Sequence, residues 1–138
     1  MPVSFCWHPF LQIPGASRER WELRWPRCDR VLVAGRVIPT GERVPQPAER
    51  AQLARRTFDD HYALGTDRRF ALRAGDRRVE LRFGPTYPYA QLFVPARGNF
   101  AAIEPMTATI DALGRGTTPV VEPGGRLLAA FNLAVTTS

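Results

Sequence analysis

Apolar and polar residues alternate along several short stretches of this chain. In residues 20–25 (RWELRW), two tryptophans and a leucine occupy every second position. This period of two is typical of a β-strand with one buried face, because successive side chains of a strand point to opposite sides. The same alternation recurs in residues 70–73 and 78–83, which flank a Gly-Asp turn. These two runs are therefore predicted to form a β-hairpin.

Two further apolar runs, residues 90–94 and 100–103, are joined by the short segment PARGN. A glycine-containing loop of this length predicts another hairpin. Its second arm ends at Glu104, and Pro105 follows at once. Proline has no N–H to continue a strand ladder and favours an extended backbone in the residue before it, so Glu104 is expected where a buried strand stops. The pattern alone favours an ordinary solvated acid at a strand end.

Shorter sequence patterns predict the secondary structure of the remaining segments. Residues 3–7 and 29–33 are apolar runs that predict strands, and residues 36–38 predict another that ends at a Pro-Thr-Gly-Glu turn. The tail, residues 126–135, predicts a closing strand, and its mixed apolar run indicates burial on both faces. Residues 47–56 (PAERAQLARR) have good helix formers after a leading proline, and they predict a short turn of helix on the surface.

Length and composition agree with this assignment. A chain of 138 residues fits one domain and can bury a core. Hydrophobic residues make up 44% and charged residues 23%, which excludes a disordered chain. The 13 prolines and 11 glycines suit the frequent turns of an all-β protein better than a helical one. We therefore predict a single domain, residues 1–138, built as an antiparallel β-sandwich.

The formal net charge is +6, and every basic residue is arginine. A basic surface can bind nucleic acid, but these arginines are scattered among acidic residues and accompany no nucleic-acid-binding motif. No apolar run is long enough to cross a bilayer, and no basic leader begins the chain. Two cysteines, Cys6 and Cys28, match neither a disulfide framework nor a metal-ligand pattern. A cytoplasmic protein that binds neither nucleic acid nor membrane is expected.

Two places carry candidate chemistry besides Glu104. His8 lies in an aromatic-rich apolar segment, where an imidazole can act as an acid near neutral pH. The simpler alternative is a core or edge histidine with one backbone hydrogen bond. Asp59 and Asp60 lie in an aromatic frame that suits a sugar, since carboxylates accept hydrogen bonds from hydroxyls and rings pack on its apolar face. The alternative there is an Asx turn with solvated carboxylates.

Three segments together resemble the C-terminal part of the aldose 1-epimerase (galactose mutarotase-like) family. They are PVSFCWHPFLQIPG, FAAIEPMTATIDAL and VVEPGGRLLAAFNLAV, which carry the histidine–proline motif, the EPMT motif and a PG turn before a last strand. The segment TFDDHYAL is similar to the family's D-x-x-[FY] element. Phe10 stands where the family more often has Tyr, and Cys6 where Gly is usual. The resemblance implies the two-sheet sandwich of that family.

The resemblance also implies roles for single residues. Glu104 takes the place of the catalytic base and His8 that of the general acid. Asp59 corresponds to the aspartate that holds sugar hydroxyls, while Asp60 and His61 fall on variable positions. Tyr89 is expected to line the pocket, and Gln91, two residues along the strand, to face the same side and bind a hydroxyl. Tyr87 is expected to line the pocket together with Tyr89.

The implied function is interconversion of the α and β anomers of an aldose, a hexose or a hexose 6-phosphate. Glu104 removes the proton of the anomeric hydroxyl while protonated His8 donates to the ring oxygen. His8 is then expected to be held charged by a carboxylate, and Glu104 to be kept ionised by hydrogen bonds. No metal and no organic cofactor is needed. The alternatives are a sugar-binding domain without catalysis, and a structural fragment with neither property.

The resemblance covers nearly the whole chain, but only about the C-terminal half of the family's usual domain. The missing half carries an Arg and a second His of the sugar site, for which this sequence offers no candidates. Half of a sandwich exposes strand edges and an apolar face. We therefore expect the chain to self-associate through those edges.

Overall fold

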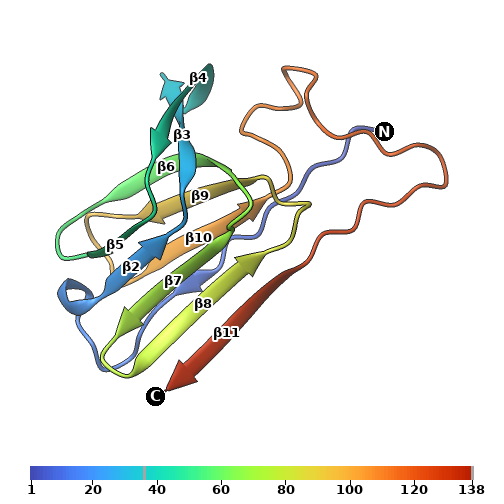
Figure 1. Ribbon diagram of the computed structural model, residues 1–138. Helices are drawn as coiled ribbons and strands as arrows, with labels where there is room; N and C mark the ends of the chain where they lie inside the picture. Colours follow the sequence, from blue (N-terminus) through green and yellow to red (C-terminus); the bar gives the residue numbers. More distant parts are fainter. Residues whose placement is uncertain (36, 138) are drawn as a thin grey trace.

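The structure, a computed structural model, describes residues 1–35 and 37–137, and it is all-β as predicted. Two antiparallel sheets face each other (Figure 1). One sheet contains, in spatial order, β1 (Phe10–Leu11), β10 (Ala101–Met106), β9 (Tyr89–Val94), β6 (Phe58–Leu64), β3 (Cys28–Ala34) and β4 (Ile38–Gln46). The other contains β11 (Phe131–Thr137), β8 (Arg77–Phe83), β7 (Arg69–Ala74), β2 (Glu22–Trp25) and β5 (Glu49–Gln52).

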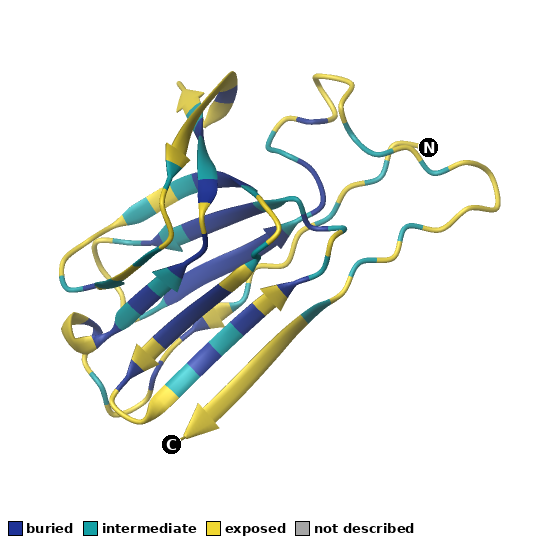
Figure 2. Cartoon of the chain, viewed as in Figure 1, coloured by how far each residue is buried: buried dark blue, intermediate teal, exposed yellow. Residues whose placement is uncertain are grey.

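The core lies between the two sheets, as the burial colours in Figure 2 show. The alternating segment around β2 supplies Trp21, Leu23 and Trp25, all buried, so the predicted apolar face is confirmed. Leu72 of β7 and Leu92 of β9 are fully buried in the same core. The predicted hairpin at residues 70–83 is also confirmed, because β7 pairs with β8 in antiparallel register.

The central hairpin is confirmed with one difference. Strands β9 and β10 pair along their length, but β10 continues through Pro105 to Met106 instead of stopping at Glu104. The carbonyl of Pro105 accepts a hydrogen bond from the backbone N–H of Trp7. The nitrogen of Pro105 therefore also faces the N-terminal segment and not β9, so its missing N–H removes no bond from the β9 ladder.

The predicted helical turn in residues 47–56 is wrong. Residues 49–52 form β5, which pairs with β2 from Glu22 to Trp25. Burial alternates along β5, and Leu53 just after it is buried, with its N–H donating to the carbonyl of Trp21. Pairing with the open edge of β2 outweighs the weak helix propensity of this short stretch.

Three shorter assignments also need correction. The turn expected after residues 36–38 is a bulge inside β4, where the register with β3 shifts and Gly41 has φ 97°. Arg36 itself lies outside the described residues. Residues 3–7 are not a strand: Cys6 forms an isolated bridge with Met106, and Pro2, just before the segment, forms one with Val120. The tail does form a strand, β11, but six of its seven residues are exposed, because it is the edge of its sheet.

Candidate functional site

The register of the six-stranded sheet brings most of the predicted site residues to one surface. Glu104 of β10, Gln91 of β9 and His61 of β6 are direct cross-strand neighbours, so their side chains project from the same face. Tyr89 and Asp59 lie two positions away along their strands and share that face. We call the surface that carries these five side chains the site face. It is the face opposite to the core.

His8 reaches the site face from the N-terminal segment. Phe10 pairs with Ala102 in β1–β10, and Cys6 forms a bridge with Met106. The same antiparallel register places His8 opposite Glu104. Its Nε2 atom is 2.9 Å from Oε1 of Glu104. Two residues 96 positions apart are thereby brought into contact, although their catalytic roles remain predictions.

The two partners of this pair have unlike environments. The His8 side chain is 45% exposed, whereas that of Glu104 is 9% exposed. Burial raises the pKa of Glu104 above its usual range; the His8 imidazole acts in the opposite sense, and the nearby Asp59 carboxylate adds to the rise. The expectation that hydrogen bonds would keep Glu104 easily ionised is therefore not met. A carboxylate with a raised pKa is a stronger base, which suits proton abstraction near neutral pH.

Phe10 supports the imidazole of His8. The two ring centroids are 4.5 Å apart, and Phe10 also makes an edge-to-face contact with Phe100 at 5.0 Å. Phe93 of β9, in register with Asp59, contacts Phe100 as well. These three phenylalanines form an apolar border beside the His8–Glu104 pair. Sequence analysis noted Phe10 only as a departure from Tyr and missed the other two, because their contacts depend on the register.

Asp59 and Gln91 form a second polar pair on the site face. Nε2 of Gln91 donates a hydrogen bond to Oδ1 of Asp59 at 2.7 Å. Asp60 points to the other face of β6, where it pairs with Arg30 at 3.6 Å. The alternative of an Asx turn at these residues is wrong, because both lie inside strand β6. Tyr87, expected beside Tyr89, is instead fully buried in the core.

His61 is buried at the centre of the site face and is 2% exposed. Its ring stacks on Tyr89 with centroids 5.5 Å apart, and its Nε2 lies 2.9 Å from Oγ1 of Thr109. Burial lowers the pKa of His61 to about 4, so the imidazole is neutral at neutral pH. Sequence analysis gave His61 no role. The alternation from Asp59 places it on the same face, but nothing in the sequence points to Thr109.

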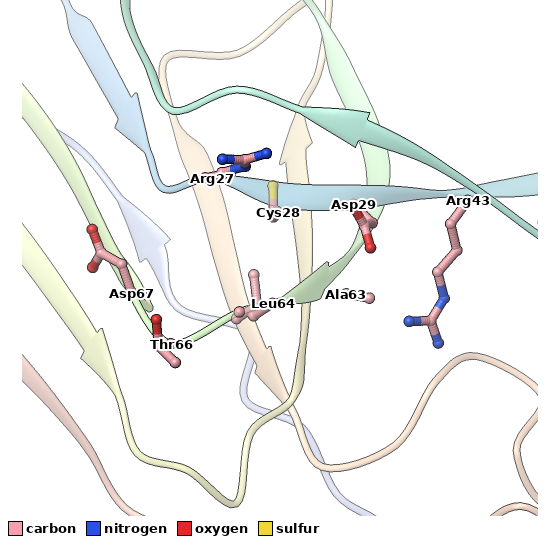
Figure 3. Close-up of a pocket in the computed structure, with 9 residues that line it drawn as sticks. Arg27, Cys28, Asp29, Arg43, Ala63, Leu64, Thr66 and Asp67 are labelled. Carbon is pink, nitrogen blue, oxygen red and sulfur yellow. The ribbon is translucent and has the colours of Figure 1, made fainter.

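A cavity of about 310 Å³ opens beside β3 and β6. Figure 3 shows Asp29 and Arg43 with their charged groups turned toward it, and Arg27 and Asp67 also line it. Because both acidic and basic side chains line it, the cavity does not indicate a ligand of one charge. None of the predicted site residues lines it. Among residues 1–35 and 37–137, no cluster of three or more His, Cys, Asp or Glu side chains could hold a metal ion. No helix in this part of the chain is long and apolar enough to cross a membrane.

Two solved structures share this architecture. A galactose mutarotase-like protein from Clostridium acetobutylicum superimposes on 100% of this chain with a TM-score of 0.86 and 18% sequence identity. The Slr1438 protein from Synechocystis sp. PCC 6803 does so with a TM-score of 0.76 and 21% identity. This chain covers 48% and 46% of their lengths, about half of each. No protein-family model matches the sequence, and no curated protein matches it significantly. The shared architecture establishes the fold: this chain is a galactose mutarotase-like β-sandwich.

Proposed function

We propose that the chain binds an aldose on the site face and interconverts its α and β anomers. The contact between His8 and Glu104 is the observation that carries this proposal. A titratable imidazole and a buried carboxylate lie 2.9 Å apart, on a surface that also presents hydrogen-bonding groups and aromatic rings. Such a pair can move one proton onto the ring oxygen and another off the anomeric hydroxyl in one active site. The proposed domain, residues 1–138, would be the C-terminal portion of the family's larger domain.

The reaction would proceed by ring opening and closure. Glu104 accepts the proton of the anomeric hydroxyl, and the electrons of that O–H bond form the C1 carbonyl. The C1–O5 bond breaks, and its electrons take a proton from protonated His8 at O5. Rotation about C1–C2 presents the other face of the aldehyde, and the reverse proton transfers close the ring. On closure Glu104 returns its proton to the anomeric oxygen and His8 regains the proton from O5, so both residues end in their starting protonation states and no cofactor is consumed.

Asp59 and Gln91 would hold the sugar for this step. Changing Asp59 to Asn should raise KM about 10- to 100-fold, because hydrogen bonds to a charged group contribute about 1.5–3 kcal/mol. The variant should also move the acid limb of the pH–rate profile to lower pH, since the Asp59 carboxylate raises the pKa of Glu104. Steady-state kinetics as a function of pH would measure both effects.

Asp60→Asn provides the matched control, because Asp60 lies next in the chain but faces the opposite side of β6. It should leave KM and the acid limb unchanged. Equal effects of the two substitutions would contradict the role assigned to Asp59.

A sugar-binding domain without catalysis is the alternative to a mutarotase. It would use the same Asp59–Gln91 pair, and it would show sugar-dependent thermal stabilisation without acceleration of anomer exchange. The alternative substrate class is a hexose 6-phosphate, to be compared with the free hexose in the same assay.

We also propose that the chain associates through β11. This edge strand has seven residues and no charged residue or proline to discourage pairing. Leu133 and Val135 are 46% and 68% exposed, although they pair with Leu81 and Val79, which are buried. The core-facing side of the sheet therefore stays uncovered at β11. A second copy pairing β11 to β11 about a two-fold axis would satisfy the unpaired backbone groups of this edge.

Light scattering at micromolar concentration should accordingly give the mass of a dimer. Val135→Lys should return the chain to a monomer, because it places a charge on the uncovered side of the edge strand. Leu113→Lys, at an equally exposed residue outside both sheets, is the control and should leave the dimer intact. A monomeric parent chain would contradict the proposal.

A further inference from the structure

His61 has no part in the proton transfers proposed above, yet it is the most deeply buried polar residue of the site face. It lies directly across from Gln91 in the β6–β9 register, and Gln91 in turn lies across from Glu104. One edge of its ring meets Thr109, which follows β10 in the chain. Its position connects the segment after the EPMT motif with the polar pair that would bind sugar.

The hydrogen bond from Gln91 to Asp59 fixes which way the Gln91 amide points. Its Nε2 donates to the Asp59 carboxylate, so its Oε1 points away from Asp59. This Oε1 is buried, as is Nδ1 of His61 on the neighbouring strand, and among the described residues neither atom has a hydrogen-bond partner. Gln91 and the backbone of Ala90 both raise the pKa of His61 against the effect of burial, which is the effect of an acceptor beside the ring, and Gln91 is the direct cross-strand neighbour of His61.

This arrangement selects one tautomer of His61. An amide oxygen only accepts hydrogen bonds, so a hydrogen bond between these two unpartnered atoms requires the proton on Nδ1 of His61. A neutral imidazole carries one N–H, so its Nε2 is then an acceptor and the Thr109 hydroxyl donates to it. Thr109, His61, Gln91 and Asp59 would thus form a chain of hydrogen bonds in which each group sets the orientation of the next.

We propose that His61 is a positioning residue: its Nδ1–H holds the Gln91 amide so that the NH₂ group faces Asp59 and fixes the carboxylate that receives the sugar. The inference rests on the proposed function, because Asp59 is taken as the group that binds the sugar hydroxyls. With the amide reversed, Oε1 of Gln91 would face the Asp59 carboxylate, and the two acceptors would repel each other. The Asp59 carboxylate would then be displaced from the position in which it binds the sugar hydroxyls.

Nitrogen NMR of the labelled chain tests the tautomer without any need for activity. The chain has two histidines, so a His8→Ala variant assigns the His61 signals. At pH 7 we expect a neutral His61 with its proton on Nδ1, and loss of that preference in Gln91→Met, which keeps the side-chain length without the amide. The inference would be overturned if His61 were protonated on Nε2, or if the preference for Nδ1 persisted in Gln91→Met.

Kinetics test the positioning role. The amide nitrogen of Asn is as far along the side chain as Nδ1 of His, so His61→Asn should keep KM within about threefold. His61→Leu fills the site without a donor and should raise KM about 10-fold with a smaller change in kcat. Equal KM values for the Asn and Leu variants would overturn the inference. An inactive parent chain would reject the proposed function alone, because the tautomer is read independently.

Discussion

Replacement of Glu104 by Gln is expected to slow anomer exchange by about 10²- to 10⁴-fold, the usual contribution of one general acid or base. Glutamine has nearly the shape of glutamate and can still accept a hydrogen bond from His8. It cannot take up the proton of the anomeric hydroxyl, so kcat should fall while KM changes little. Exchange rates of fresh α-glucose, followed by NMR at several sugar concentrations, separate these two quantities.

The same variant should be no less stable than the parent chain at pH 7. The pKa of Glu104 is raised in the folded state, so its protonated form is the one the fold favours. The stability it contributes is present below its unfolded pKa and is lost as pH rises through its folded pKa, and a neutral amide avoids that loss. Glu122→Gln, at an exposed acid, is the control for both measurements. A Glu104→Gln variant as active as the parent would contradict the assignment of the base.

Acid is expected to destabilise the fold through His61 by about 3 kcal/mol. Burial lowers the pKa of His61 from 6.5 to about 4, and each unit of such a shift corresponds to about 1.4 kcal/mol. The folded state binds this proton less readily than the unfolded state. The contribution is therefore complete above pH 6.5 and is lost progressively as pH falls through 6.5 toward 4.

Urea denaturation at pH 7, 5.5 and 4 measures this loss. Between pH 7 and pH 4, the free energy of unfolding of the parent chain should fall by about 3 kcal/mol more than that of His61→Asn. The other titrating groups are present in both proteins, so their contributions cancel in this difference. Glu122→Gln is the control, because it changes an exposed acid outside the site face and should leave the acid dependence intact. Parallel pH curves for the parent and His61→Asn would show that His61 is not buried as a neutral group.

The strands that the sequence predicts well are those whose pattern reflects local burial. The alternation at Trp21, Leu23 and Trp25 depends only on which side of β2 meets the core, and the structure confirms it. The errors arise where a distant neighbour decides. Residues 49–52 become a strand because β2 offers an open edge, and β11 stays exposed because it is the edge strand of its sheet. No local pattern contains that information.

The same distinction applies to the site. The residue pattern alone left Glu104 and His8 as an ordinary acid and an ordinary histidine, and only the family resemblance proposed a role for them. Their contact depends on the antiparallel register between the N-terminal segment and β10, which spacing along the chain does not encode. Thr109 could not be found for the same reason, since its hydrogen bond with His61 joins a strand to a loop 48 residues later.

The most direct test of the account is anomer exchange by the purified parent chain. Fresh α-glucose and α-galactose would be followed by NMR against a protein-free control, with the fold checked by circular dichroism. The account predicts an exchange rate that exceeds the spontaneous rate, is proportional to protein concentration and saturates with sugar. A folded chain that leaves both sugars at the spontaneous rate would contradict the claim that His8 and Glu104 form a working acid–base pair.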